Sequence, residues 1–172
     1  MILNRLNKPL QIIMLLITAI GLSSCVSYSF TGASIPPEAK TISIQYFDNN
    51  ASFIVPTLSE SLTLDVKDRF SSQTSLILIN KNGDLQIEGV ITDFKTSPQA
   101  ISGDEAASNR LSISVKVKFV NLIEPDKNYQ TTFTRYEDYA SSLNLADVQD
   151  ELIKKINEML VDDIFNKAVV NW

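Results

Sequence analysis

The chain has 172 residues, with 15 basic and 20 acidic side chains, one cysteine and no histidine. This length suits one domain with a proper core, and the net charge of −5 argues against nucleic-acid binding, which normally needs a basic face. The absence of histidine removes the commonest general base and the usual metal ligand, and a single cysteine excludes an intramolecular disulfide. Composition therefore favours a binding or assembly role over catalysis.

Residues 1–25 have the pattern of an export signal. A basic start (Arg5 and Lys8) precedes an apolar run over residues 9–22, which is shorter than the ~20 residues of a membrane-spanning helix. The run ends in Leu22-Ser23-Ser24-Cys25, which resembles the lipobox of bacterial lipoproteins. That resemblance implies removal of residues 1–24, acylation of Cys25 and a membrane anchor without a spanning helix. The alternative is an ordinary secretory signal followed by a cysteine without a role.

Removing residues 1–24 would leave a more acidic chain. Both basic residues of the signal would go, which leaves 148 residues with 13 basic and 20 acidic side chains, a net charge of about −7. Residues 25–40 contain two prolines and have no charge before Glu38, which is typical of an extended tether. We predict that residues 41–172 form the single folded domain.

The first half of this domain predicts a strand, a helix and two further strands. Residues 41–47 alternate, with Ile42, Ile44 and Tyr46 on one face of a half-buried strand. Thr57 and Glu60 have the spacing of a capping box before a helix that ends near residue 71. The apolar stripe of that helix repeats every four residues, at Leu58, Leu62, Val66 and Phe70.

A hairpin is predicted next. Residues 76–79 form a short apolar strand, and Asn82-Gly83 after it is a strong signal for a hairpin into a return strand over residues 85–94. Gly89 interrupts the alternation of the return strand, which indicates a bulge or a close approach. Residues 95–109 are polar and are predicted to be a long connection.

The second half contains the clearest alternation in the chain. Over residues 111–119 the apolar side chains are predicted to share one face and the polar ones the other: Leu111, Ile113, Val115, Val117 and Phe119 against Ser112, Ser114, Lys116 and Lys118. A turn over residues 124–128 leads to a strand over residues 129–139, with Tyr129, Thr131, Phe133 and Arg135 on one side. Asn144 and Asp147 then offer a helix cap, and a broad apolar stripe continues to about residue 170.

The resulting order is β-α-β-β-β-β-α. It predicts an α+β fold in which two helices pack on one largely antiparallel or mixed sheet.

Few side chains in the sequence indicate a chemical site. The acidic pairs lack any specific spacing, so we predict no catalytic residue, no metal site and no cofactor. Lys116 and Lys118 line one strand face, with Arg110 just before them and Arg135 on the next strand. Such a face could receive phosphate or another anionic head group. The alternative is a solvated face whose lysines discourage edge-to-edge association.

The ordered motifs resemble the LptE-like family of lipopolysaccharide-assembly lipoproteins. They begin with Cys25, Tyr28-Ser29-Phe30, Gly32 and Ile35-Pro36-Pro37-Glu38-Ala39-Lys40-Thr41-Ile42. Further resemblance to the Bacteroidota branch lies in Gly83-Asp84-Leu85-Gln86, Asn109-Arg110-Leu111, Arg135-Tyr136-Glu137-Asp138-Tyr139 and the segment over residues 163–172. The resemblance implies two helices on a sheet and a non-enzymatic lipoprotein in the outer membrane that faces the periplasm.

The resemblance also implies partners. Members of that family occupy the lumen of a large outer-membrane β-barrel (LptD-like), assist its assembly and bind lipopolysaccharide. Arg110, Lys116, Lys118 and Arg135 are the candidate contacts with lipopolysaccharide or the barrel, and Cys25 is the site of lipid attachment. An alternative is a free-standing periplasmic lipoprotein that binds an amphiphilic ligand. A lipid-anchored hydrolase would need a nucleophile motif, and none is recognisable in the sequence.

Overall fold

The computed structural model describes residues 35–99 and 107–170 of the chain. The predicted signal, Cys25 and most of the predicted tether lie outside these residues. The elements in the described part are β1 (Thr41–Ile44), β2 (Asp48–Asn49), α2 (Pro56–Gln73), β3 (Ile77–Ile79), β4 (Leu85–Pro98), β5 (Ser108–Asn121), the 3-10 helix η1 (Pro125–Lys127), β6 (Tyr129–Ala140) and α3 (Leu145–Val169). The predicted α+β class is confirmed.

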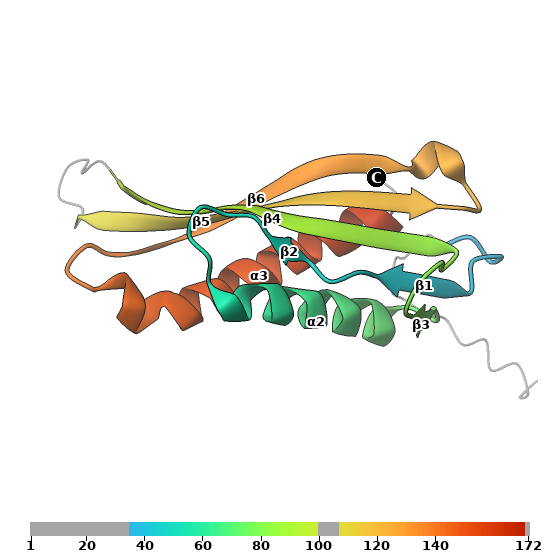
Figure 1. The fold of residues 1–172 in the computed structure, drawn as a ribbon, viewed down its shortest axis with the longest axis horizontal. Coiled ribbons are helices and arrows are strands. Elements are labelled where there is room, and N and C mark those ends of the chain that lie inside the picture. The colour runs from blue at the N-terminus through green and yellow to red at the C-terminus, as the bar shows by residue number, and fades with distance from the viewer. Residues whose placement is uncertain (1–34, 100–106, 171–172) are drawn as a thin grey trace, which may run out of the picture. The chain divides into compact units, whose positions relative to one another are not determined.

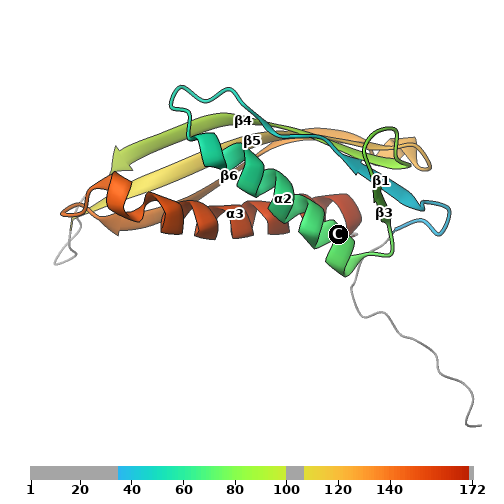
Figure 2. The ribbon, with the colours of Figure 1, turned by 60° about the horizontal axis from the view of Figure 1, so that its bottom comes forward.

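The strands form one mixed sheet in the order β3-β1-β4-β5-β6, and β2 also pairs with β4. β1 runs parallel to both of its neighbours, whereas β4, β5 and β6 are antiparallel. Both helices lie on the same face of this sheet (Figures 1 and 2). The layer of helices therefore leaves the opposite sheet face without a helical cover in the described part of the chain.

The core lies between the helices and the inner sheet face. The five apolar side chains predicted for β5 are all at most 2% exposed, and the predicted stripe of α2 is at most 1% exposed. In α3 the stripe is broad, and Phe165 meets Phe70 of α2 edge to face with 5.1 Å between ring centroids. Period-2 and period-3.6 patterns thus predicted the buried faces correctly, because burial of apolar area is what selects these faces.

The predicted Asn82-Gly83 hairpin is wrong. Asn82 does adopt the left-handed conformation expected of a turn, with φ 58°. However, β3 and β4 do not pair with each other, because β1 lies between them and pairs in parallel with both. The turn therefore reverses the chain around β1 and does not close a two-stranded hairpin.

The first strand is shorter than predicted. β1 ends at Ile44, and Tyr46 is 55% exposed where the alternation placed it with Ile42 and Ile44. The break between β1 and β2 turns Phe47 into the core instead, where it is fully buried and its N–H donates to Thr63 Oγ1 at 3.0 Å. Phe47 lies directly against Gly89, so the predicted close approach at that glycine is confirmed.

Two other boundaries differ from the sequence-based expectation. α2 begins with Pro56 at its first position, and no side chain caps it, so the capping box predicted at Thr57 is wrong. Proline suits this position because its missing N–H would have no partner there. Both ends of the polar segment predicted as a connection over residues 95–109 are strand: β4 continues to Pro98 and β5 starts at Ser108, because each strand satisfies the backbone of the other.

Helix α3 starts where the sequence predicted. Asn144 occupies the N-cap position, although its side chain makes no capping hydrogen bond. Its amide nitrogen instead lies 3.4 Å from a carboxylate oxygen of Asp147. Neither this helix nor α2 is long and apolar enough to cross a membrane.

Asp84 joins the start of β1 to the start of β4. Its Oδ2 accepts hydrogen bonds from the N–H of Lys40, the N–H of Thr41 and the hydroxyl of Thr41, each at 2.9 Å. These bonds lower the pKa of the Asp84 carboxyl, and the bond from the Lys40 N–H has the largest effect. A lowered pKa means that Asp84 stabilises the fold above its unfolded pKa of about 3.9 and loses this contribution as pH falls through the folded pKa.

Asp84→Ala is therefore expected to lower Tm at pH 7, because three donors lose their acceptor. The difference in Tm from the wild type should shrink as the pH falls below about 4, because the unfolded chain then binds a proton at Asp84 that the folded carboxylate takes up only at lower pH. Thermal melts followed by circular dichroism between pH 3 and pH 7 measure both effects. Asp126→Ala removes the same charge from an exposed position and should leave Tm nearly unchanged; an equal loss in both variants would contradict a specific role for Asp84.

Candidate interaction surface

The helix-free sheet face carries three of the four candidate basic residues. The register places Lys118 between Glu88 and Gln130. It also places Lys116 between Val90 and Thr132, and Arg110 between Ser97 and Asp138. We call the outward-facing side chains of β4, β5 and β6 the open sheet face.

Arg110 is held in a fixed position on the open sheet face. Its guanidinium donates two hydrogen bonds to the carboxylate of Asp138, at 2.7 and 2.8 Å, and lies 3.6 Å from the ring centroid of Tyr136. The bond to Asp138 raises the pKa of Arg110, and the same bond lowers the pKa of Asp138. Arg110 is therefore a neutralised, oriented group and not a free cation.

The two lysines differ in their surroundings. Lys118 donates to Glu88 Oε2 at 3.1 Å, whereas Lys116 has no carboxylate partner among the described residues. Next to them, the hydroxyls of Ser114 and Thr134 lie 2.8 Å apart. Lys116 is thus the basic group of this face that can meet an external anion without first losing an ion pair.

Arg135 does not belong to the open sheet face. It lies opposite Ile113, which is fully buried, and so points to the helix side of β6. There its guanidinium donates to both oxygens of Asp163 on α3, each at 2.6 Å, and this bond raises the pKa of Arg135. The four candidate residues therefore do not form one cluster: three share a face, and Arg135 links β6 to α3.

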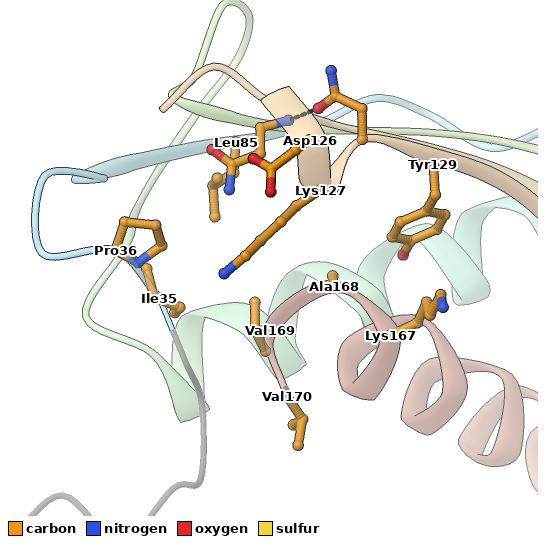
Figure 3. Close-up of a pocket in the computed structure, with 12 residues that line it drawn as sticks. Ile35, Pro36, Leu85, Asp126, Lys127, Tyr129, Lys167, Ala168, Val169 and Val170 are labelled. Carbon is orange, nitrogen blue, oxygen red and sulfur yellow. Dashed lines mark hydrogen bonds between the residues drawn. The ribbon is translucent and has the colours of Figure 1, made fainter. Parts of the chain in front are cut away.

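An open pocket of about 310 Å³ lies where β5, η1 and the last turn of α3 meet the first described residues (Figure 3). In the close-up, Lys127 extends across it toward Pro36 and Ile35. The Tyr129 hydroxyl is buried and has no hydrogen-bond partner within residues 35–99 and 107–170, and burial raises the pKa of Tyr129. The Lys167 ammonium lies 5.7 Å from the ring centroid of the same tyrosine. The pocket combines apolar walls with two lysines and one carboxylate, Asp126, and Lys127 is already paired with Glu124 at 3.0 Å.

The sequence did not indicate Glu88, Asp138 or this pocket. Glu88 and Asp138 are relevant because each forms an ion pair with a basic residue on the neighbouring strand. Which residues lie opposite each other depends on the strand register. The pocket joins segments that lie far apart in the chain. The described residues hold no group of three or more possible metal ligands.

Comparisons with known proteins give a family and a fold. A family model described as LptE, lipopolysaccharide-assembly, matches residues 39–168. No curated protein matches the chain in sequence.

Similar solved structures include the hypothetical protein CT253 from Chlamydia trachomatis, with 10% identity and a TM-score of 0.53, covering 75% of this chain and 97% of that one. A neuraminyllactose-binding hemagglutinin homolog from Helicobacter pylori has 10% identity and a TM-score of 0.51, covering 78% and 86%. Rare lipoprotein B from Shewanella oneidensis has 13% identity and a TM-score of 0.49, covering 74% and 90%. At such low identity the first two likenesses show a shared fold and nothing more.

Proposed function

The chain belongs to the LptE family of lipopolysaccharide-assembly proteins, and we propose that it is a non-catalytic lipoprotein subunit of the outer-membrane lipopolysaccharide translocon. In this proposal residues 1–24 are a cleaved signal, acylated Cys25 anchors the protein, and the domain faces the periplasm. It docks in a large β-barrel partner (LptD-like), assists assembly of that barrel and helps to deliver lipopolysaccharide to the outer leaflet. The family match carries the proposal, because it spans nearly all of the described domain.

The open sheet face supports docking inside a barrel. The lumen of an outer-membrane barrel is polar, and its strands present hydrophilic side chains inward. The rows across β4, β5 and β6 present hydroxyls and paired charges, such as Ser114 with Thr134 and Arg110 with Asp138. A domain with this surface can enter a wet lumen, where water solvates Lys116 and the other charges are paired, whereas it would be unfavourable against lipid tails.

Purification of a tagged protein from detergent-solubilised outer membranes tests the proposal. We expect a large β-barrel protein to be recovered with it in near-stoichiometric amount. A tagged outer-membrane lipoprotein of another family, purified in parallel, controls for detergent-resistant aggregates. Recovery of the chain alone would contradict the proposal and favour the free-standing lipoprotein that binds an amphiphile.

Lys116→Glu is expected to weaken lipopolysaccharide binding more than Lys118→Glu. Lys116 has no carboxylate partner among the described residues, whereas Lys118 already donates to Glu88. An ion pair exposed to water contributes about 0.2–1 kcal/mol, so we expect a loss of about 1.4- to fivefold in affinity for Lys116→Glu. Titration of the purified protein with lipopolysaccharide measures the change.

Lys154→Glu is the matched control for this prediction. It makes the same charge change at an exposed position on α3, on the other side of the molecule. Equal losses of affinity in the Lys116 and Lys154 variants would mean that the effect comes from the change in net charge and not from the position of Lys116. Unchanged binding in the Lys116 variant would assign that lysine to a solvated face.

A further inference from the structure

The end of the domain at which the described chain begins is formed by four segments. We call it the tether end and define it by residues 35–41, 74–85, 121–128 and 166–170. Hydrogen bonds join the first three of them: the Ile77 N–H donates to the Lys40 carbonyl, and the Leu122 N–H donates to the Asp84 carbonyl, both at 2.9 Å. Figure 1 shows β3, the start of β1 and the η1 turn at this same end.

The tether end exposes large aliphatic side chains. Ile77 is 64% exposed and Leu122 is 56% exposed. Ile77 in β3 pairs with Thr41 at the start of β1. Thr41 is hydrogen-bonded to Asp84, just before β4, and the Asp84 carbonyl accepts from the N–H of Leu122, just after β5. Two more exposed side chains of this kind, Leu78 and Ile123, follow them directly in sequence. Four exposed aliphatic side chains around one end are unfavourable in contact with water.

The tether end also lacks the acidic excess of the chain. The whole chain has a net charge of −5, but the four segments of the tether end contain equal numbers of lysines and carboxylates: Lys40, Lys81, Lys127 and Lys167 against Glu38, Asp84, Glu124 and Asp126. A surface without net negative charge can approach anionic phospholipid without repulsion, and lysines are favourable beside such head groups.

We propose that the tether end lies on the phospholipid surface, with Ile77 and Leu122 in the boundary between head groups and acyl chains. This inference rests on the proposed anchor at Cys25. Nine residues lie between Cys25 and Ile35, and the ten Cα-to-Cα steps span at most about 35 Å, so the anchor holds this end close to the bilayer. Aliphatic side chains gain by leaving water at that depth, and their position sets the orientation of the domain on the membrane.

Exposed aliphatic side chains elsewhere provide a matched comparison. Ile54 is 61% exposed and precedes α2, whereas Ile77 follows α2. The 18 residues of α2 give a helix about 27 Å long between these positions. A bilayer that lies against the tether end therefore does not reach Ile54.

Quenching of tryptophan fluorescence by brominated phospholipids tests this orientation. The chain has one tryptophan, so Trp172→Phe gives a background in which Ile77→Trp, Leu122→Trp and Ile54→Trp are each examined alone in the full, acylated protein. Each variant is incorporated into vesicles of phosphatidylethanolamine and phosphatidylglycerol that contain dibromophosphatidylcholine. Thermal melts verify that each variant is folded.

We expect quenching at Ile77→Trp and Leu122→Trp to be at least about twofold stronger than at Ile54→Trp. Equal quenching at all three positions, or none at the tether end, would overturn the proposal. If the tryptophan of Ile77→Trp is shielded from solvent only after a copurified barrel protein is added, the exposed aliphatic residues belong to a contact with a protein partner. That result would also overturn the proposal.

The anchor is measured separately, by the mass of the peptide that contains Cys25. If cells do not acylate this cysteine, the proposed function fails, but the orientation is still tested. The protein is then coupled through Cys25 to a maleimide-bearing phospholipid, which attaches it at the same point, and the same three positions are compared.

Discussion

Cys25→Ser is expected to release the protein from the membrane fraction almost completely. A single acyl chain gives only marginal and reversible membrane binding, and stable attachment takes a second signal, so loss of all acyl chains should remove the anchor. The described part of the chain has no membrane-spanning helix that could replace it. Metabolic labelling with palmitate and fractionation of outer membranes measure the two consequences, loss of label and appearance of the protein in the soluble fraction.

Ser24→Ala is the matched control for this prediction. It keeps a small residue directly before the cysteine and should leave both labelling and membrane attachment unchanged. Loss of label without loss of membrane attachment in Cys25→Ser would mean that a protein partner, and not the lipid, holds the domain at the membrane. Retention of label would show that Cys25 is not the acylated residue.

Gly89→Ala is expected to destabilise the fold by about 3 kcal/mol, because it overpacks the core. A Cβ atom on Gly89 would lie 2.2 Å from two ring carbons of Phe47, a fully buried side chain. The ring cannot move away freely, since β4 and α2 enclose it. Chemical denaturation measures the free energy of unfolding, and Tm should fall by about 10 °C.

The double variant Gly89→Ala with Phe47→Leu separates this clash from other effects of the substitution. Removing the ring creates space for the new methyl group, so the double variant should lose less stability than the two single variants together. Additive losses would mean that the cost of alanine at this position comes from the strand backbone and not from contact with Phe47.

Much of the fold and little of the candidate surface could be predicted from local patterns. The buried faces of β5, α2 and α3 follow from alternation with a period of 2 or 3.6 residues, and the close approach at Gly89 was visible as a break in that alternation. Arg110 and Lys118 were visible as basic residues, but their partners Asp138 and Glu88 were not. A pattern within one strand contains no information about the residue opposite to it.

The sequence by itself determined the class of the fold, the buried faces of β5, α2 and α3, and the family to which the chain belongs. These depend on hydrophobic periodicity and on ordered motifs, which are local properties. Only the tertiary structure decided that β1 separates β3 from β4, that Arg135 binds Asp163 on the helix side, and that the tether end gathers Ile77 and Leu122. Each of these depends on the pairing of segments far apart in the chain, where competing registers differ by a few contacts and only the packed core selects one.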